Sequence, residues 1–327
     1  MKKRICLLAA YDSQNIIDDY VVYLVKELSK FSDVYYYSDN NMADSEFKKL
    51  DGIAKSAKGH SHGCYDFGSW SFIMQDIGHE KLSEYDEVIL TNEAAFGPMV
   101  SLNHMLNDMD SRNVDVWGMC GNKFIMSFFI ALSKKVFTHP DFKHFFNNIK
   151  AEGDKNVVIK KYEQGINRLI TDNKFSTSVY ISGQDTKTFY NQSKKDIKCQ
   201  IKTVTPFWAR PFVKVQPGKV RLYDDSFLIP LMMKMPVLKK VSLLLHDSIL
   251  GAHYVSLIKE NTDYPVELIT NYFKRINKFP PSTKVAIKSR IRTFLRSFIF
   301  RRKYKRNKII FYIFKIPVWF KTMNYKI

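Results

Sequence analysis

Apolar runs alternate with helical periodicities along the first half of the chain. Residues 4–10, RICLLAA, form a continuous apolar run, as expected for a strand buried on both faces of a parallel sheet. Residues 15–31 place apolar side chains at helical spacing, and residues 33–39, DVYYYSD, are rich in aromatic and β-branched side chains. This β-α-β order predicts an α/β fold with a mainly parallel central sheet.

The same alternation continues as far as residue 182. Further strands are predicted over 85–92, 114–119 and 176–182, and further helices over 70–82, 141–150 and 157–171. The octapeptide GCYDFGSW, residues 63–70, is expected to form a loop, because two glycines stand among its aromatic side chains. Residues 184–225 carry few clear signals, so an irregular stretch is expected there.

The positive charge of the chain is concentrated near its C-terminal end. The net charge is +19, and 17 of the 51 Lys and Arg side chains follow Glu267, where Asp and Glu are absent. Residues 1–267 are therefore nearly neutral. Pro280 and Pro281 predict a boundary between one α/β domain, 1–279, and a basic tail, 280–327.

The tail combines basic and large apolar side chains. Residues 283–300 place apolar side chains on one helical face with Lys and Arg beside it, which predicts a basic amphipathic helix on an anionic membrane surface. Nucleic acid is disfavoured as a partner, because the charge is confined to the tail and interleaved with apolar residues. A packed helical subdomain or a docking element for a partner protein is the alternative.

Cysteine use and hydropathy indicate the compartment. The four cysteines are widely spaced and form no C-x-x-C pair, which argues against a zinc ribbon or a disulfide framework and fits a reducing compartment. The apolar run at the N-terminus is too short for a signal peptide, and no apolar run reaches the roughly 18 residues of a membrane span. We expect a cytoplasmic protein, attached peripherally to the inner face of the cell membrane.

Candidate ligand-binding residues follow the predicted strands. In open α/β sheets, ligands bind beyond the C-terminal ends of the strands. Tyr11 or Tyr65 would stack on a nucleotide base, and Asp12 or Asp66 would accept hydrogen bonds from the base or ribose. The GCYDFGSW element would line the same crevice.

Asn92 and Glu93 end the predicted strand 85–92 and would lie where phosphates and a cation meet. Mg²⁺ or Mn²⁺ on a diphosphate often takes only one or two protein carboxylates, so Glu93 is the candidate metal ligand. G-x-G-x-x-G, P-loop and G-x-S-x-G motifs are absent from the sequence, which disfavours dinucleotide, P-loop and serine-hydrolase sites. His60 and His62 are expected in an exposed loop rather than in a metal pair.

These motifs, taken in order, resemble the rhamnan-synthesis protein F family of bacterial polysaccharide glycosyltransferases. The segments that carry the resemblance are RICLLAAYD with the helix after it, GCYDFGSW, YDEVILTNEAAFGPM and VDVWGM. The resemblance is good over residues 3–135 and continues more faintly through Glu163, MPVLKK at 235–240 and DYPVELI at 263–269.

The resemblance implies a GT-A-like fold and a nucleotide-sugar donor such as dTDP-L-rhamnose. It also implies a lipid-linked saccharide acceptor of a growing cell-surface polysaccharide. GCYDFGSW would then grip the nucleotide: Asp66 would bind base or ribose, Ser69 belongs to the same element, and Gly68 would let the backbone approach. Glu93 would hold the divalent cation. The predicted activity is transfer of rhamnose or a related hexose with inversion.

Inverting transfer needs a base that takes the proton of the acceptor hydroxyl. The candidates are Glu163, which matches an acid of the family, and Asp115, which begins a predicted strand. Two departures from the family pattern stand out: Asn92-Glu93 replaces Asn-Asp, and MSFF at 126–129 replaces QSYF. The second departure supports the alternative function, a membrane-recruited, catalytically inactive scaffold protein of polysaccharide assembly.

Overall fold

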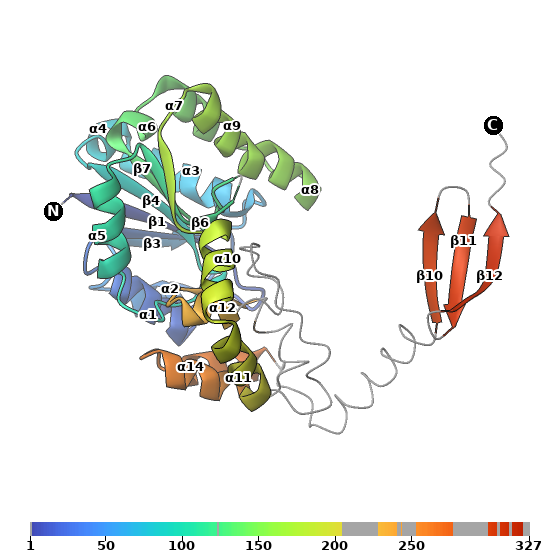
Figure 1. The fold of residues 1–327 in the computed structure, drawn as a ribbon. Helices are drawn as coiled ribbons and strands as arrows, with labels where there is room; N and C mark the ends of the chain where they lie inside the picture. Colours follow the sequence, from blue (N-terminus) through green and yellow to red (C-terminus); the bar gives the residue numbers. More distant parts are fainter. Residues whose placement is uncertain are drawn as a thin grey trace. The chain divides into compact units, whose positions relative to one another are not determined.

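The structure is a computed structural model of the chain (Figure 1). It describes residues 2–122, 124–204, 228–240, 243 and 253–276, together with the strands at 300–305, 308–313 and 316–322. Two compact units are present, Met1–Ile276 and Asn277–Ile327. The boundary that the sequence predicts at residue 280 lies outside the described residues.

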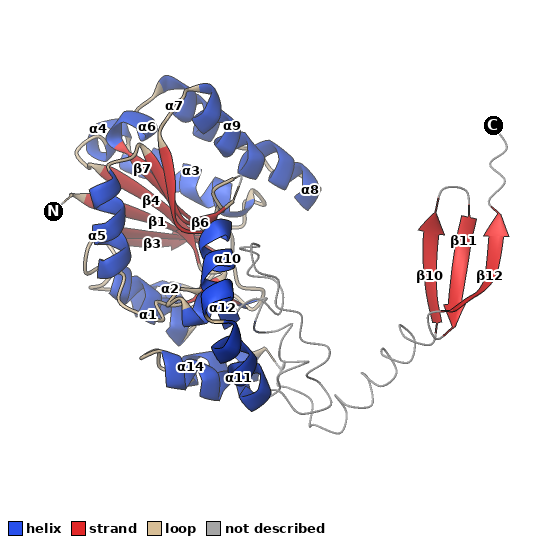
Figure 2. Ribbon diagram, in the orientation of Figure 1, coloured by secondary structure: helices blue, strands red, loops and turns tan. Residues whose placement is uncertain are grey.

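Seven strands form the central sheet of the first unit, in the order β3-β2-β1-β4-β7-β6-β8 (Figure 2). β7 pairs antiparallel with β4 and β6, and the other pairings are parallel. This confirms the predicted α/β fold with a mostly parallel sheet. The strands are β1 (Arg4–Ala10), β2 (Asp33–Ser38), β3 (Ser56–Gly59), β4 (Glu87–Asn92), β6 (Val116–Gly121), β7 (Phe129–Ser133) and β8 (Thr177–Ser182).

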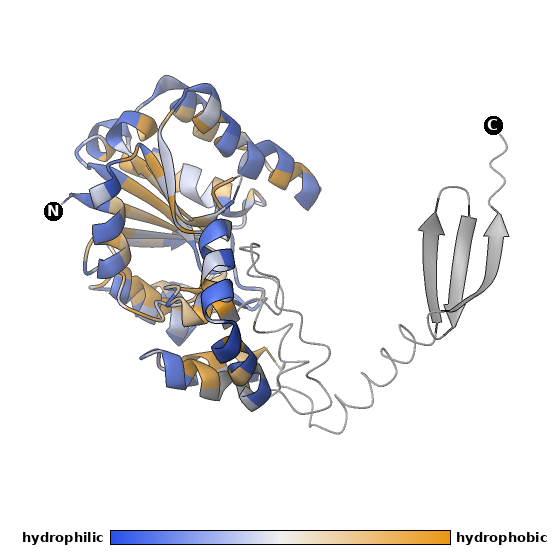
Figure 3. Cartoon of the chain, viewed as in Figure 1, coloured by the Kyte–Doolittle hydropathy of each residue, from blue (hydrophilic) through white to orange (hydrophobic). Residues whose placement is uncertain are grey.

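Helices cover both faces of this sheet, and the apolar strands lie between them (Figure 3). Alternate residues of β1 enter the two cores: Cys6 and Leu8 pack in one, Ile5 and Leu7 in the other. A strand buried on both faces is mostly apolar, which is why ICLLAA, after the ion-paired Arg4, is a continuous apolar run. α1 (Asp19–Leu28), α5 (Asn103–Arg112) and α15 (Glu267–Arg275) contribute to the first core, and α3 (Tyr65–Ile77), α7 (Pro140–Asn147) and α9 (Gln164–Asp172) to the second.

Shorter elements connect these layers. They are α2 (Asp44–Phe47), η1 (Lys48–Leu50), α4 (His79–Leu82), α6 (Lys134–Phe137), α8 (Lys155–Val158), the π-helical turn η2 (Ile159–Glu163), α12 (Leu228–Met232) and α14 (His253–Asn261).

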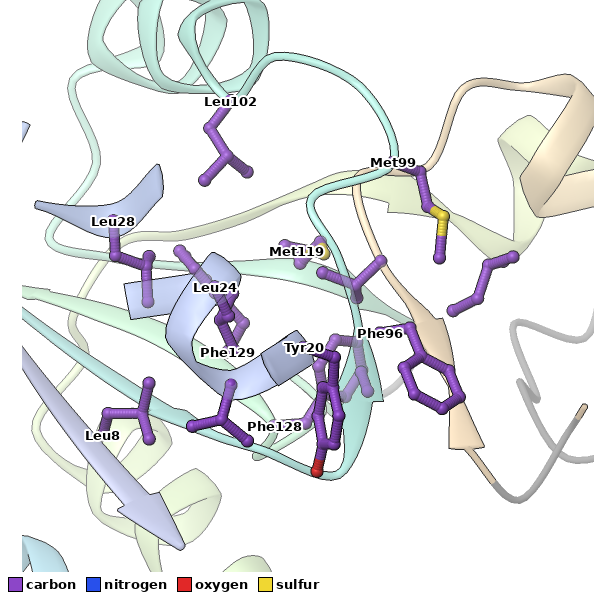
Figure 4. Packing of buried hydrophobic residues seen from close by; sticks show 14 of the residues in the cluster. Leu8, Tyr20, Leu24, Leu28, Phe96, Met99, Leu102, Met119, Phe128 and Phe129 are labelled. Atoms are coloured by element: carbon purple, nitrogen blue, oxygen red, sulfur yellow. The ribbon is translucent and has the colours of Figure 1, made fainter. Parts of the chain in front are cut away.

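A small two-stranded sheet forms directly after β4. β5 (Ala95–Phe96) pairs antiparallel with β9 (Leu238–Lys239). The Phe96 ring packs edge-on against Tyr20 of α1, with 4.9 Å between ring centroids (Figure 4). Gly97 permits the close approach, because a Cβ there would lie 2.7 Å from Val237 and 2.8 Å from the carbonyl oxygen of Pro236. Residues 235–240 are thereby fixed beside the end of β4.

Two local predictions need correction. GCYDFGSW is not mainly a loop, since α3 begins at Tyr65 and includes its last six residues. Residues 183–204 form α10 (Gly183–Gln192) and α11 (Lys194–Val204), where an irregular stretch was expected. Only Gly183 and Thr186 of α10 are buried. The helix therefore lacks the periodic apolar face from which a helix can be predicted. The available signal was the capping box formed by Ser182 and Asp185.

The described part of the tail is a three-stranded antiparallel sheet of β10 (Phe300–Lys305), β11 (Lys308–Ile313) and β12 (Ile316–Thr322). The prediction of a helical tail is therefore wrong for these residues. The β-branched and aromatic side chains of β11 and β12 favour strands. Residues 283–299, which hold nearly all of the expected amphipathic helix, lie outside the described residues. None of the helices in the described ranges has the length and apolar character of a membrane span.

Candidate functional site

Asp66 and Asn92 meet at the edge of the sheet where β1, β2 and β4 end. The side-chain amide of Asn92 donates a hydrogen bond to Asp66 Oδ2, with 2.7 Å between the heavy atoms. Asp66 lies in the first turn of α3, and α3 is held to β4 by the buried Trp70, whose indole N–H donates to the carbonyl oxygen of Thr91 at 3.0 Å. Trp70 is thus a core residue that positions Asp66.

The environment of Asp66 is mixed in charge. Burial raises the pKa of this carboxyl, and the hydrogen bond from Asn92 and the positive charge of Lys239 oppose the shift. The negative charge of Glu163 raises the pKa of Asp66 further.

Asp39, directly after β2, fixes the turn that leads into α3. Its Oδ1 accepts hydrogen bonds from the backbone N–H groups of His62, at 2.7 Å, and Gly63, at 2.9 Å. Its Oδ2 accepts from the N–H of Tyr65 at 3.3 Å. Tyr65 has a φ of 56°, a conformation that a bulky residue rarely adopts. Such strain often marks a functional position. Sequence reasoning missed Asp39, although an acid at a strand end was the signal.

Tyr11 and Tyr65 expose their rings at this edge. Tyr11 follows β1 and is 60% exposed, and Tyr65 opens α3 and is 43% exposed. Most large apolar side chains of the described residues are buried, so these two rings are unusual. Each offers the flat surface that stacking on a base requires.

Asp12 is engaged within the protein. Its Oδ1 accepts hydrogen bonds from the N–H of Gln14, at 2.9 Å, and from Arg275 Nη1, at 3.2 Å. Arg275, at the end of α15, also donates from Nε to Asp18 Oδ1 at 2.8 Å. Asp12 therefore orders the turn after β1 and joins it to α15. Of the two candidates for binding base or ribose, Asp66 is the better placed.

Gly68 and Ser69 support the turn rather than face a ligand. A Cβ at Gly68 would lie 2.2 Å from Cβ of Cys64 and 2.9 Å from the His62 ring. The close approach that needs a glycine is therefore to the protein's own chain. Ser69 is buried, and its hydroxyl lies 3.1 Å from His62 Nε2. Within the described ranges, no three or more His, Cys, Asp or Glu side chains are grouped so that they could hold a metal ion.

Glu93 is buried beside a lysine. Its Oε1 accepts a hydrogen bond from the N–H of Tyr11 at 3.3 Å and lies 3.7 Å from Lys240 Nζ. Burial raises the pKa of Glu93 to about 7, although Lys240 and the Tyr11 amide oppose the shift. An ammonium group thus stands where a divalent cation would have to bind this carboxylate. The metal role of Glu93 is a prediction that these contacts do not support.

Asp115 lies at the opposite edge of the sheet. It precedes β6, and its carboxylate accepts hydrogen bonds from the backbone N–H of Ser176, at 2.9 Å, and from Lys135 Nζ, at 3.1 Å. Burial would raise the pKa of Asp115, but the bonds from Ser176 and the contact with Lys135 lower it on balance. A strand such as β6 spans ~17–20 Å. Asp115 is therefore not brought together with the other candidates.

Glu163, the other candidate base, ends η2 and is partly exposed. Asn167, one turn later, donates from its side chain to the Glu163 carbonyl oxygen at 2.9 Å and accepts from the N–H of Ile125 at 3.0 Å. A polar groove of about 400 Å³ begins at this amide and follows β8. Its lining includes Asn122, Phe124, Asn167, Thr171, Ser182 and Asp185.

The family model described as rhamnan synthesis protein F matches residues 34–316. The chain belongs to this family. A solved structure also resembles it: a putative nucleotide-diphospho-sugar transferase from Desulfovibrio desulfuricans G20, with 14% identity and a TM-score of 0.33, over 59% of this chain and 89% of that one. No curated protein matches the chain.

One departure from the pattern of the rhamnan synthesis protein F family falls on packing residues. In the segment 126–129, Phe128 and Phe129 are buried, and Met126 packs against the same core. The Phe128 ring lies under Lys239, with 4.8 Å from Nζ to the ring centroid. The two phenylalanines therefore fill the core in this member of the family and leave the Asp66–Asn92 pair in place.

Proposed function

We propose that the protein is a glycosyltransferase that moves a sugar from a nucleotide-diphosphate donor to a saccharide acceptor. The observation that carries this proposal is the hydrogen-bonded Asp66–Asn92 pair at the C-terminal edge of the sheet, flanked by the exposed rings of Tyr11 and Tyr65. Membership of a rhamnan synthesis family supports polysaccharide synthesis as the process. Rhamnose or a related hexose is the proposed donor sugar.

The donor's nucleotide is assigned to the turn before α3. Tyr65, held in its unusual backbone conformation by Asp39, stacks on the base, with Tyr11 as the second ring. Asp66 accepts hydrogen bonds from the base or ribose, and Asn92 orients its carboxylate. This division of work uses the groups that lie at the edge of the sheet, where ligands of α/β proteins bind.

The transfer step is assigned to Glu163. The acceptor hydroxyl oxygen forms a bond to the anomeric carbon while the bond from that carbon to the diphosphate oxygen breaks, and the configuration inverts. The hydroxyl proton passes to the Glu163 carboxylate, and the bonding electron pair leaves with the diphosphate.

The groove along β8 is the proposed seat of the acceptor saccharide. Its amide, hydroxyl and carboxylate groups suit sugar hydroxyls, and Phe124, which is 48% exposed, offers an apolar ring face. The volume of about 400 Å³ lies in the range of small-molecule sites. Asn167, which lines the groove, also bonds to the backbone carbonyl oxygen of Glu163, so the base belongs to a segment next to the proposed saccharide.

A panel of nucleotide sugars tests the proposal. At least one donor should be hydrolysed or transferred, and Asp66→Asn should raise its Michaelis constant roughly 10- to 150-fold, since a hydrogen bond to a charged group contributes about 1.5–3 kcal/mol. Asp76→Asn is the matched control, because Asp76 lies in the same helix and forms an exposed ion pair with Lys58. Unchanged donor kinetics in the Asp66→Asn variant would show that this carboxylate has a structural role and does not bind the donor.

We further propose that the tail attaches the enzyme to anionic membrane, near a lipid-linked acceptor. Several of the 17 basic residues after Glu267 would act together, each contributing ~1 kcal/mol near such a surface. Removing residues 282–327 should leave a folded body, because Met1–Ile276 is a compact unit. The shortened protein should no longer sediment with phosphatidylserine vesicles, and added salt should release the full-length protein. Equal vesicle binding by both forms would exclude the anchor.

A further inference from the structure

Two adjacent lysines reach the end of β4 from a distant part of the chain. Lys239 pairs with Ala95 in the β5–β9 sheet, and the N–H of Lys240 donates to the carbonyl oxygen of Ala94 at 3.0 Å. Successive side chains of a strand point to opposite faces. Lys239 accordingly lies over Phe128 and acts on Asp66, while Lys240 lies beside Glu93.

Lys240 is held by several groups at once. Its Nζ donates a hydrogen bond to the hydroxyl of Tyr20 at 2.7 Å and lies 5.0 Å from the ring centroids of both Tyr20 and Tyr272. The Tyr20 hydroxyl in turn donates to the carbonyl oxygen of Glu93 at 3.4 Å. The Lys240 side chain is only 14% exposed. Its ammonium is thus a fixed cation, tethered next to the carboxylate at the strand end.

A divalent cation bound to Glu93 would face this ammonium at close range. Two like charges without water between them repel strongly, so the cation would have to displace Lys240 from Glu93, Tyr20 and both rings. The donor set around Glu93 therefore suits an ammonium better than a metal ion.

We propose that Lys240 supplies positive charge for the donor's diphosphate, a role that the sequence pattern assigns to a divalent cation. The inference rests on the proposed transferase function. As the bond between the anomeric carbon and the diphosphate oxygen breaks, the electron pair stays on that oxygen, and the Lys240 ammonium stabilises the charge without giving up a proton. Glu93 acts as a positioning residue for Lys240.

Calorimetric titration of the full-length protein with UDP and dTDP tests this. One nucleotide should bind in EDTA with a Kd within about twofold of that in Mg²⁺ or Mn²⁺. Lys240→Met should weaken this binding at least tenfold, since a hydrogen bond to a charged group is lost, and Lys240→Arg should retain part of it. Lys30→Met, in an exposed pair with Glu27, is the control and should bind as the unchanged protein does.

Three results would overturn the inference. Binding that disappears in EDTA and returns with Mn²⁺, in the unchanged protein, assigns the charge to a metal ion, whether or not Lys240→Met folds. Binding by a folded Lys240→Met variant that equals the control removes the lysine from the site. If neither nucleotide binds with or without cation, the transferase proposal itself fails, and the inference fails with it.

Discussion

Glu163→Gln should lower kcat about 10²- to 10⁴-fold, the usual contribution of a positioned general base. Glutamine keeps the size of the side chain but cannot take the proton of the acceptor hydroxyl. Donor affinity should stay within about twofold, because the donor is assigned to Asp66 and the tyrosines. Initial rates with saturating donor and acceptor provide the measurement.

Glu152→Gln is the matched control for this substitution. Glu152 lies on the same polar segment and pairs with Lys161 at its surface, so its loss should leave kcat unchanged. If Glu163→Gln and Glu152→Gln have equal turnover, the base lies elsewhere, and the placement of the acceptor next to α9 loses its support.

Arg4→Met should lower the free energy of unfolding by about 3–5 kcal/mol, because it leaves a buried carboxylate without its main partner. Arg4 and Glu87 are both buried, and Arg4 Nε donates to Glu87 Oε2 at 2.7 Å. Glu87 Oε1 accepts from the indole N–H of Trp117 at 3.0 Å and from Lys2 Nζ at 3.2 Å. Urea unfolding gives the free energy directly.

Two further variants separate this loss from a general effect of the substitution. Replacing both members of the pair with methionine should restore part of the stability, since no charge is then left buried. Lys58→Met, which breaks the exposed pair with Asp76, should cost less than about 1 kcal/mol. If Arg4→Met and Lys58→Met lower the free energy of unfolding by similar amounts, the buried pair contributes no more to stability than the exposed pair.

Strands that are buried on both faces could be predicted well from the sequence. β1 is apolar at every position after Arg4, and β4 contains the apolar run VIL at 88–90, because each strand is covered by helices on either side, and that pattern is local. Tyr65 shows where local pattern fails. Its helix starts in an unusual backbone conformation that Asp39, 26 residues earlier, holds in place. A segment with two glycines then looks like a loop, although tertiary bonds make it a helix.

The sequence predicts where the candidate site lies, but it does not predict the hydrogen bonds and ion pairs between the residues of the site. The strand end at Asn92-Glu93 and the GCYDFGSW element were expected to line one crevice, and the structure brings Asp66 and Asn92 together at that edge of the sheet. Whether such a carboxylate faces a ligand depends on basic side chains from distant parts of the sequence, which can form ion pairs with it. Lys240 is brought to Glu93 by the β5–β9 pairing. The sequence around residue 93 gives no sign of this contact.

The bond between Arg275 and Asp12 spans 263 residues of sequence. At a synthesis rate of about 5–20 residues per second, Arg275 is added roughly 15–50 s after Asp12. β1 itself has its neighbour β2 much earlier, but Asp12 and Asp18 stay without their arginine until α15 has emerged. The edge of the sheet that carries the candidate site is therefore the last part of the first unit to be completed on the ribosome.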